Sequence, residues 1–363
     1  MKIEELCKLK VNKPDTAIFN ESKRRWDCIA KPLDGLGRFE EMICRIASIK
    51  KNADVSLDKK ALVIMCSDNG IVNRGVSQTG QSVTKDVAVL MSENKSSVGI
   101  MTKTYPLDIF PVDVGINADI KKGGLIDRKI SKGTKDFSLE PAMTKDQCME
   151  AISVGIDMAN DLFKKGYDII ATGEMGIGNT TTSTALLCAL AGLKSSQITG
   201  RGAGLSDKGL ELKIKVIDDA LKKYKLGSYV DPGCSNDKKI YAFRALCVVG
   251  GYDIAALAGL FIGCALNGLP IIIDGAISAV SALTASYIVP GCEEYMLASH
   301  MGKEKSVAVV LNILGLKGVI DADLALGEGS GAVMLFPLLD MAHALYMHGT
   351  GFNETKIDSY KRL

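Results

Sequence analysis

Short runs of apolar residues alternate along the chain with longer segments that have helical periodicity. Each run ends in polar residues or glycines, which is typical of parallel strands that are buried on both faces of a sheet. The pattern predicts strands at 61–66, 108–112, 168–171, 271–273 and 319–321. The fold class is therefore expected to be α/β, a mostly parallel sheet flanked by helices. Ligands of such sheets bind beyond the carboxyl ends of the strands, where the polar and glycine clusters would gather.

One long segment also fits a membrane span. Between 254 and 292 the only charge is Asp274, and 254–273 alone is long enough to cross a bilayer. The turn signal Asn267-Gly268-Leu269-Pro270 interrupts it. We therefore expect a helix at 254–266, a turn and a buried strand at 271–273, and keep the membrane span as the alternative.

The two ends of the chain differ from the middle. Residues 1–55 are charged and helical in pattern, and another apolar helix is predicted around 333–346. We expect a small helical domain made of 1–55 with part of the C-terminal segment, about 341–363, and a catalytic domain at 56–340. The polar, glycine-containing stretch 121–141 is expected to be a long loop.

Composition excludes several classes of protein. Hydrophobic residues make up 47% and charged residues 24%, which rules out disorder. A net charge of +2 is too small to indicate a nucleic-acid-binding surface. Ten cysteines form no CxxC pair, as expected of free thiols in a reducing cytoplasm. The three histidines show no metal-ligand spacing. We expect a cytoplasmic protein with no metal, no membrane and no nucleic-acid partner.

Glycine-rich turns follow the predicted strands. The segment from Gly173 to Thr180 resembles a phosphate-binding loop that has Asn179 in place of the lysine. Glycines such as Gly176 and Gly178 let backbone N–H groups approach an anion at the positive end of the next helix. A tight turn without a ligand is the alternative.

A second glycine cluster, Gly200–Gly204, contains Arg201 and precedes a helix expected at 207–221. Lys213 on that helix could reach a phosphate as a point charge. A solvated surface lysine is the alternative.

The third cluster surrounds a carboxylate. Glu328 stands between Gly327 and Gly329, after an apolar run and before an apolar helix. A carboxylate there is suited to general-base catalysis. A glutamate that merely begins the helix is the alternative.

Taken together, the motifs and their order resemble the nicotinate-nucleotide–dimethylbenzimidazole phosphoribosyltransferase family from about residue 30 to 350. The resemblance rests on Pro32–Arg38, Asp68-Asn69-Gly70, Gly75-Val76-Ser77, Val112–Gly115, Lys132-Gly133-Thr134, Glu140–Thr144, Gly173–Thr181, Gly200–Lys213, Asp274-Gly275, Ser299-His300 and Leu326–Ala332. It implies a Rossmann-like catalytic domain, a small helical domain built from both chain ends, and a homodimer.

The resemblance also implies a reaction: transfer of phosphoribose from nicotinate mononucleotide to 5,6-dimethylbenzimidazole or a related base. The products are α-ribazole 5′-phosphate and nicotinate. Nicotinate leaves a cationic glycosidic nitrogen as a neutral ring, so neither a metal nor another cofactor is expected. The attacking benzimidazole must lose the proton on its second nitrogen, and one carboxylate base suffices.

Family positions assign a role to each candidate. Glu328 takes the position of the general base. The residues expected to bind the nucleotide and its phosphate are Glu174, Gly176, Gly178, Asn179, Arg201, Lys213, Asp274 and Gly275. Those expected to bind the incoming base are Ser77, Gln78, Gln81 and Leu326.

Three alternatives remain open. The loop at 77–81 is polar and small where the family commonly has an aromatic residue or proline, so the chain could be a paralogue that activates adenine or a phenol. A nicotinamide-dinucleotide oxidoreductase would need a third glycine after Gly176-Ile177-Gly178 and an acid about 20 residues further on. A catalytically silent nucleotide-binding regulator is the third alternative.

Overall fold

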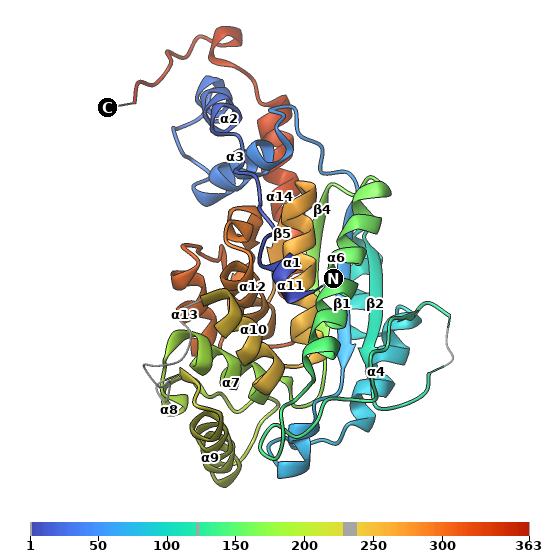
Figure 1. Cartoon of the computed structure of the whole chain (residues 1–363). Coiled ribbons are helices and arrows are strands. Elements are labelled where there is room, and N and C mark those ends of the chain that lie inside the picture. Colours follow the sequence, from blue (N-terminus) through green and yellow to red (C-terminus); the bar gives the residue numbers. More distant parts are fainter. Residues whose placement is uncertain (1, 121–122, 228–237, 363) are drawn as a thin grey trace.

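A six-stranded parallel sheet forms the centre of the computed structural model, which describes residues 2–120, 123–227 and 238–362 (Figure 1). The strand order is β3-β2-β1-β4-β5-β6, and every neighbouring pair is parallel. The strands are β1 (Lys60–Ser67), β2 (Asp108–Gly115), β3 (Ile126–Asp127), β4 (Ile169–Met175), β5 (Ile271–Ile273) and β6 (Met296–Ala298). This arrangement confirms the predicted fold class.

Burial on both faces explains the continuous apolar runs. Every residue of β1 is buried. Its alternate residues enter different cores: Ala61, Val63 and Met65 pack on one face, whereas Leu62, Ile64 and Cys66 pack on the other. A strand that faces two layers of helices has no polar side, and hence no alternation in its sequence.

Helices cover both faces of the sheet. On one face α11 packs against α6 and α12, and on the other α14 packs against α3 and α5. The helices are α1 (Ile3–Leu6), α2 (Thr16–Cys28), α3 (Arg38–Lys50), α4 (Ser82–Ser92), α5 (Ser97–Met101), α6 (Lys145–Lys164), α7 (Asn179–Ala191), α8 (Ser195–Ile198), α9 (Asp207–Tyr224), α10 (Lys238–Val249), α11 (Tyr252–Asn267), α12 (Ala276–Ile288), α13 (Lys305–Ile313) and α14 (Ser330–His348). Short 3₁₀ turns occupy Gly70–Arg74, Thr102–Thr104, Cys292–Tyr295 and Phe352–Glu354.

One predicted strand lies outside the main sheet, and the short strands β3, β6 and β7 were not predicted. The run at 319–321 does not join the main sheet: β8 (Ile320–Asp321) pairs with β7 (His300–Met301) in a separate two-stranded sheet. The N–H groups of Val319 and Ile320 both donate to Ser299 O, at 3.1 Å. This segment therefore pairs with the continuation of β6 beyond the sheet edge, and β6 itself takes the edge position next to β5.

The long uncharged segment forms core structure. It comprises α11, a turn, β5 and α12, and all of α11 from Tyr252 to Ala265 is buried, which confirms the predicted helix, turn and strand. Among the described helices, α14 is long and apolar enough to cross a membrane by length and composition, and half of that apolar window is buried inside the fold.

Helices α2 and α3 lie beside the C-terminal part of α14 at one end of the molecule, whereas α1 and the N-terminus lie near α11 and α6 (Figure 1). The rings of Trp26 in α2 and Tyr346 in α14 are 5.1 Å apart, and Ala30 N donates to Thr350 O at 2.8 Å. The helices predicted for the first 55 residues are present as α1, α2 and α3. Whether these ends act as a separate domain stays a prediction.

The remaining expectations concern loops and thiols. Between 123 and 141 the chain forms only β3 and irregular structure, while Lys121 and Lys122 lie outside the described residues. No disulfide joins two cysteines within the described part of the chain, and Cys234 lies outside it.

Candidate active site

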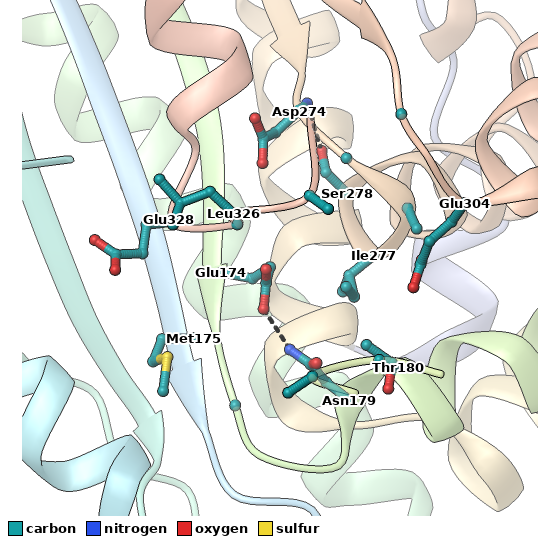
Figure 2. A pocket seen from close by; sticks show the side chains of 18 of the residues that line it. Glu174, Met175, Asn179, Thr180, Asp274, Ile277, Ser278, Glu304, Leu326 and Glu328 are labelled. Atoms are coloured by element: carbon teal, nitrogen blue, oxygen red, sulfur yellow. Dashed lines mark hydrogen bonds between the residues drawn. The ribbon is translucent and has the colours of Figure 1, made fainter. Parts of the chain in front are cut away.

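A cavity of about 360 Å³ lies at the carboxyl ends of β4 and β5 (Figure 2). Its walls come from the turn after β4, the start of α7, the start of α12, the segment after β7 and the turn that precedes α14. Figure 2 shows Glu328 and Met175 at one end, Thr180 and Glu304 at the other, and Glu174 between them. We call these the Glu328 end and the Thr180 end.

Glu328 sits in an unusual backbone conformation. Gly327, Glu328 and Gly329 have φ of 83°, 59° and 81°, three successive residues in the left-handed region. A glutamate pays about 1–2 kcal/mol for this conformation, whereas glycine does not. Its side chain is half-buried, and Oε2 accepts a hydrogen bond from Val98 N at 3.1 Å. Backbone strain held at a cavity mouth is typical of functional residues.

The turn that carries Glu328 packs directly on β4. A Cβ atom at Gly173 would lie 2.9 Å from Glu328 O and 3.0 Å from Gly329 N. Glycine at 173 therefore allows the backbone of the Glu328 turn to contact β4. The apolar run of β4 ends at this glycine, where a side chain would collide with the turn.

Glu174 is the next residue of β4, and its carboxyl group lies at the floor of the cavity. Its Oε2 accepts from Asn179 Nδ2, which also donates to Asp253 Oδ2 at 3.2 Å. Burial raises the pKa of Glu174 to about 8, and the charge of nearby Asp253 adds to the effect. Burial likewise raises the pKa of Asp253 to about 6. At neutral pH the Glu174 carboxyl is therefore mostly protonated.

Asp274 closes the cavity from the end of β5. Its Oδ1 accepts from Ala332 N at 2.9 Å, which fastens the start of α14 to the sheet. Burial raises its pKa to about 6, although backbone N–H groups favour the charged form.

The Thr180 end has the features of an anion site. Gly178, with φ of 94°, caps α7, and no side chain bonds to the first N–H groups of this helix. The positive end of α7 therefore faces the cavity.

Lys213 lies immediately behind this end. It is 1% exposed, and its Nζ donates to Thr180 Oγ1 at 2.9 Å and to Gly200 O at 3.1 Å. Gly202 lines the cavity, and a Cβ on it would be 3.7 Å from Nζ. The ammonium group therefore lies directly behind this part of the cavity wall. This burial excludes the solvated lysine considered as the alternative, and it lowers the pKa of Lys213 to about 8.

The structure brings most of the predicted residues together. Those that line the cavity are Ser77, Glu174, Gly176, Gly178, Asn179, Asp274, Gly275, Leu326 and Glu328.

Three other predicted residues point elsewhere. Arg201 is exposed and bonds to Asp207 and to Leu205 O. Gln78 donates to Gly204 O, which ties the 77–81 loop to the glycine cluster at 200–204. Gln81 accepts from Asn117 Nδ2 at 2.8 Å.

Sequence reasoning missed several lining residues. Met175, Val87 and Val307 give the cavity apolar wall, while His300 and Glu304 give it polar groups. His300 belongs to the Ser299-His300 motif, to which the sequence analysis assigned no role. Glu304 lies four residues later in a polar segment, and its position depends on the short strand β7. In the described residues no group of three or more His, Cys, Asp or Glu side chains could hold a metal ion.

Comparison with known proteins agrees with this geometry. A family profile described as phosphoribosyltransferase matches residues 11–357. The chain is 38% identical over 349 residues to the nicotinate-nucleotide–dimethylbenzimidazole phosphoribosyltransferase of Clostridium perfringens, covering 95% of this chain and 92% of the relative. The enzyme of the same name from Ruminiclostridium cellulolyticum is 40% identical over 343 residues, 94% of each chain.

Solved structures show the same fold. The crystal structure of CobT from Thermus thermophilus superposes with a TM-score of 0.86 at 31% identity, over 94% of this chain and 99% of the other. The fold and the profile match define an α/β phosphoribosyltransferase, a pentosyltransferase by reaction class. Within that class, the chain belongs to the nicotinate-nucleotide–dimethylbenzimidazole phosphoribosyltransferase family. These matches favour phosphoribosyl transfer over the oxidoreductase and the silent regulator.

Proposed function

We propose that the enzyme transfers phosphoribose from nicotinate mononucleotide to 5,6-dimethylbenzimidazole or a related base, with Glu328 as the general base. The products are α-ribazole 5′-phosphate and nicotinate, and the step belongs to synthesis of the lower ligand of cobalamin. The names of the relatives support both substrates.

The observation that carries the proposal is the Glu328 turn. A half-buried carboxylate stands at the cavity mouth in a left-handed conformation that a glutamate adopts only at a cost, beside the apolar side chains of Met175 and Leu326. A flat apolar base bound there would present an N–H group to the carboxylate. A base that removes this proton as the other nitrogen attacks contributes typically 10²–10⁴-fold to the rate.

The Thr180 end would then hold the phosphate. The start of α7 supplies the positive end of the helix dipole, and Lys213 supplies a positive charge directly behind Thr180 and Gly202. The ribose would lie between the two ends, over Glu174 and Asn179. Three residues expected to bind substrate lie outside the cavity, namely Arg201, Gln78 and Gln81. They would affect substrate binding only by holding the loops that they connect.

We further propose a cytoplasmic homodimer whose small helical domain, 1–55 with about 341–363, helps to close the partner's cavity. An exposed apolar side chain supports an interface at this domain: Met341 in α14 is 63% exposed. Light scattering after size exclusion tests the dimer, and a monomer at micromolar concentration would contradict it.

The reaction is tested by incubating the enzyme with nicotinate mononucleotide and a panel of benzimidazoles, adenine and a phenol, with products identified by mass spectrometry. We expect an α-ribazole phosphate-type product with 5,6-dimethylbenzimidazole. Glu328→Gln keeps the size of the side chain and an oxygen for Val98 N, so folding and nucleotide binding should persist while turnover falls 10²–10⁴-fold. Retention of more than about a tenth of the activity would remove Glu328 from the role of base.

A further inference from the structure

The hydrogen bonds of Ser299 determine which nitrogen of His300 carries the proton. Ser299 Oγ lies 2.7 Å from Ile273 O, and a carbonyl oxygen can only accept. The single hydroxyl hydrogen is thus committed to Ile273. Ser299 Oγ also lies 2.8 Å from His300 Nδ1, so there the hydroxyl oxygen must accept and Nδ1 must carry a hydrogen.

It follows that Nε2 of His300 is a bare acceptor. The imidazole is 4% exposed, and burial lowers its pKa, so the ring is neutral at physiological pH. A neutral ring protonated at Nδ1 has a free lone pair on Nε2. Within the described chain, Nδ1 makes the ring's only hydrogen bond.

Two glycines lie beside this nitrogen. His300 lines the cavity, and a Cβ on Gly302 or Gly275 would lie 3.7 or 4.0 Å from Nε2, the distance of an ordinary van der Waals contact. A third glycine, Gly331, packs on the other edge of the ring, where a Cβ would collide with Nδ1 at 2.2 Å. The ring is held in place, and its acceptor remains accessible from the cavity.

The chemistry of the donor nucleotide limits what can meet such an acceptor. The carboxylate of nicotinate mononucleotide only accepts hydrogen bonds, and so does its phosphate when fully ionised. The hydrogen-bond donors of the molecule are then its two ribose hydroxyls. In the proposed reaction the N–H of the incoming base is taken by the Glu328 carboxylate, whereas the His300 ring lies beside Gly331, Gly275 and Gly302 at the carboxyl end of β5.

We propose that His300 Nε2 accepts a hydrogen bond from a ribose hydroxyl of the bound nucleotide, and that Ser299 positions it by holding the Nδ1–H tautomer. This inference rests on the proposed function. It makes His300 a binding residue that distinguishes ribose from deoxyribose, because a deoxy analogue would leave this buried acceptor without a donor.

The tautomer is measured directly in the wild-type enzyme. The chain has three histidines, so long-range ¹H–¹⁵N NMR of ¹⁵N-histidine-labelled protein near pH 8 is assignable with His343→Asn and His348→Asn variants. His343 is an internal reference, because its Nε2 lies 2.6 Å from Val55 O and must therefore carry the hydrogen. We expect opposite tautomers: Nδ1–H for His300 and Nε2–H for His343. An Nε2–H tautomer at His300 would overturn the proposal.

Binding is tested with nicotinate mononucleotide and its 2′-deoxy and 3′-deoxy analogues. Wild-type enzyme should bind one analogue about tenfold more weakly than the parent nucleotide, a typical consequence of leaving one buried acceptor unpaired. His300→Phe keeps the ring shape but lacks the acceptor, and should bind that analogue and the parent with nearly equal affinity. His343→Phe is the matched control and should keep the wild-type preference.

The outcomes separate the two claims. If wild-type enzyme binds the deoxy analogues as tightly as the parent, or if His300→Phe keeps the full preference, the role of His300 is wrong while the proposed function stands. If wild-type enzyme does not bind nicotinate mononucleotide at all, the proposed function itself fails.

Discussion

Replacing Glu174 by glutamine should change how the stability of the enzyme depends on pH. Burial at the cavity floor raises the pKa of this carboxyl group from 4.5 to about 8. Between these values the unfolded chain ionises at Glu174 while the folded chain stays protonated. The unfolded state then binds fewer protons, so this group makes the wild-type enzyme less stable as the pH rises from about 4.5 to 8.

The size of the effect follows from the shift. One pKa unit corresponds to about 1.4 kcal/mol, so the range from about pH 5 to 8 sets an upper limit of about 4 kcal/mol. Because the carboxyl borders a cavity that water can enter, we expect about 2–3 kcal/mol. Glutamine cannot ionise, and its Oε1 can still accept from Asn179 Nδ2. The free energy of unfolding of Glu174→Gln, relative to wild type, should therefore increase by about 2–3 kcal/mol between about pH 5 and 8.

Urea unfolding at several pH values measures this difference. Trp26 is the single tryptophan and is 1% exposed, so its fluorescence reports the helical end, while circular dichroism reports the whole chain. Coincident transitions are needed before free energies are compared. Glu21→Gln, at an exposed position of α2, is the matched control for the same chemical change outside the cavity. A pH-independent difference for Glu174→Gln would refute the reasoning from burial.

Three further results are expected. Lys213→Met should weaken binding of nicotinate mononucleotide by about 1.5–3 kcal/mol, the range for a lost hydrogen bond to a charged group, as measured by calorimetric titration; unchanged affinity would show that the ammonium group does not act on the phosphate. Turnover should persist in excess EDTA because nicotinate leaves as a neutral ring, and loss of activity that Mg²⁺ restores would contradict this. Related benzimidazoles should react within two orders of magnitude of one another in paired competition, because apolar walls such as Met175 and Val87 discriminate a methyl group by only about 1–3 kcal/mol; a preference above about a thousandfold would show a selective pocket.

The central strands could be predicted because each is buried on both faces. The runs at 61–66, 108–112, 168–171 and 271–273 all lie in the sheet as β1, β2, β4 and β5, although β1, β2 and β4 extend further than predicted. The strand at the edge of the sheet beyond β5 was harder to predict than the central strands. β6 has three residues, and 319–321 has a similar apolar pattern but pairs beyond the sheet edge, a difference that depends on where Ser299 lies.

The candidate site was predictable where glycines mark it. Glu328 lies between Gly327 and Gly329, and Glu174 follows Gly173. These glycines are visible in the sequence, and in the structure they have positive φ or pack closely. Lys213 was recognisable by its family position, but its place behind Thr180 depends on how α9 packs against α7. The properties of His300 could not be predicted, because they follow from one hydroxyl hydrogen that is used by Ile273 O.

The two glutamates of the cavity divide the chemistry between them if the proposed reaction is correct. Glu328, at the mouth, meets the proton of the incoming base. Glu174, with a pKa of about 8, is mostly protonated in the empty enzyme but lies beneath a ribose that carries a cationic nicotinate ring. A cation nearby favours the carboxylate form, and the developing positive charge on the ribose favours it further. Departure of neutral nicotinate removes that support, so Glu174 takes up a proton and returns to the mostly protonated form that it has in the empty enzyme.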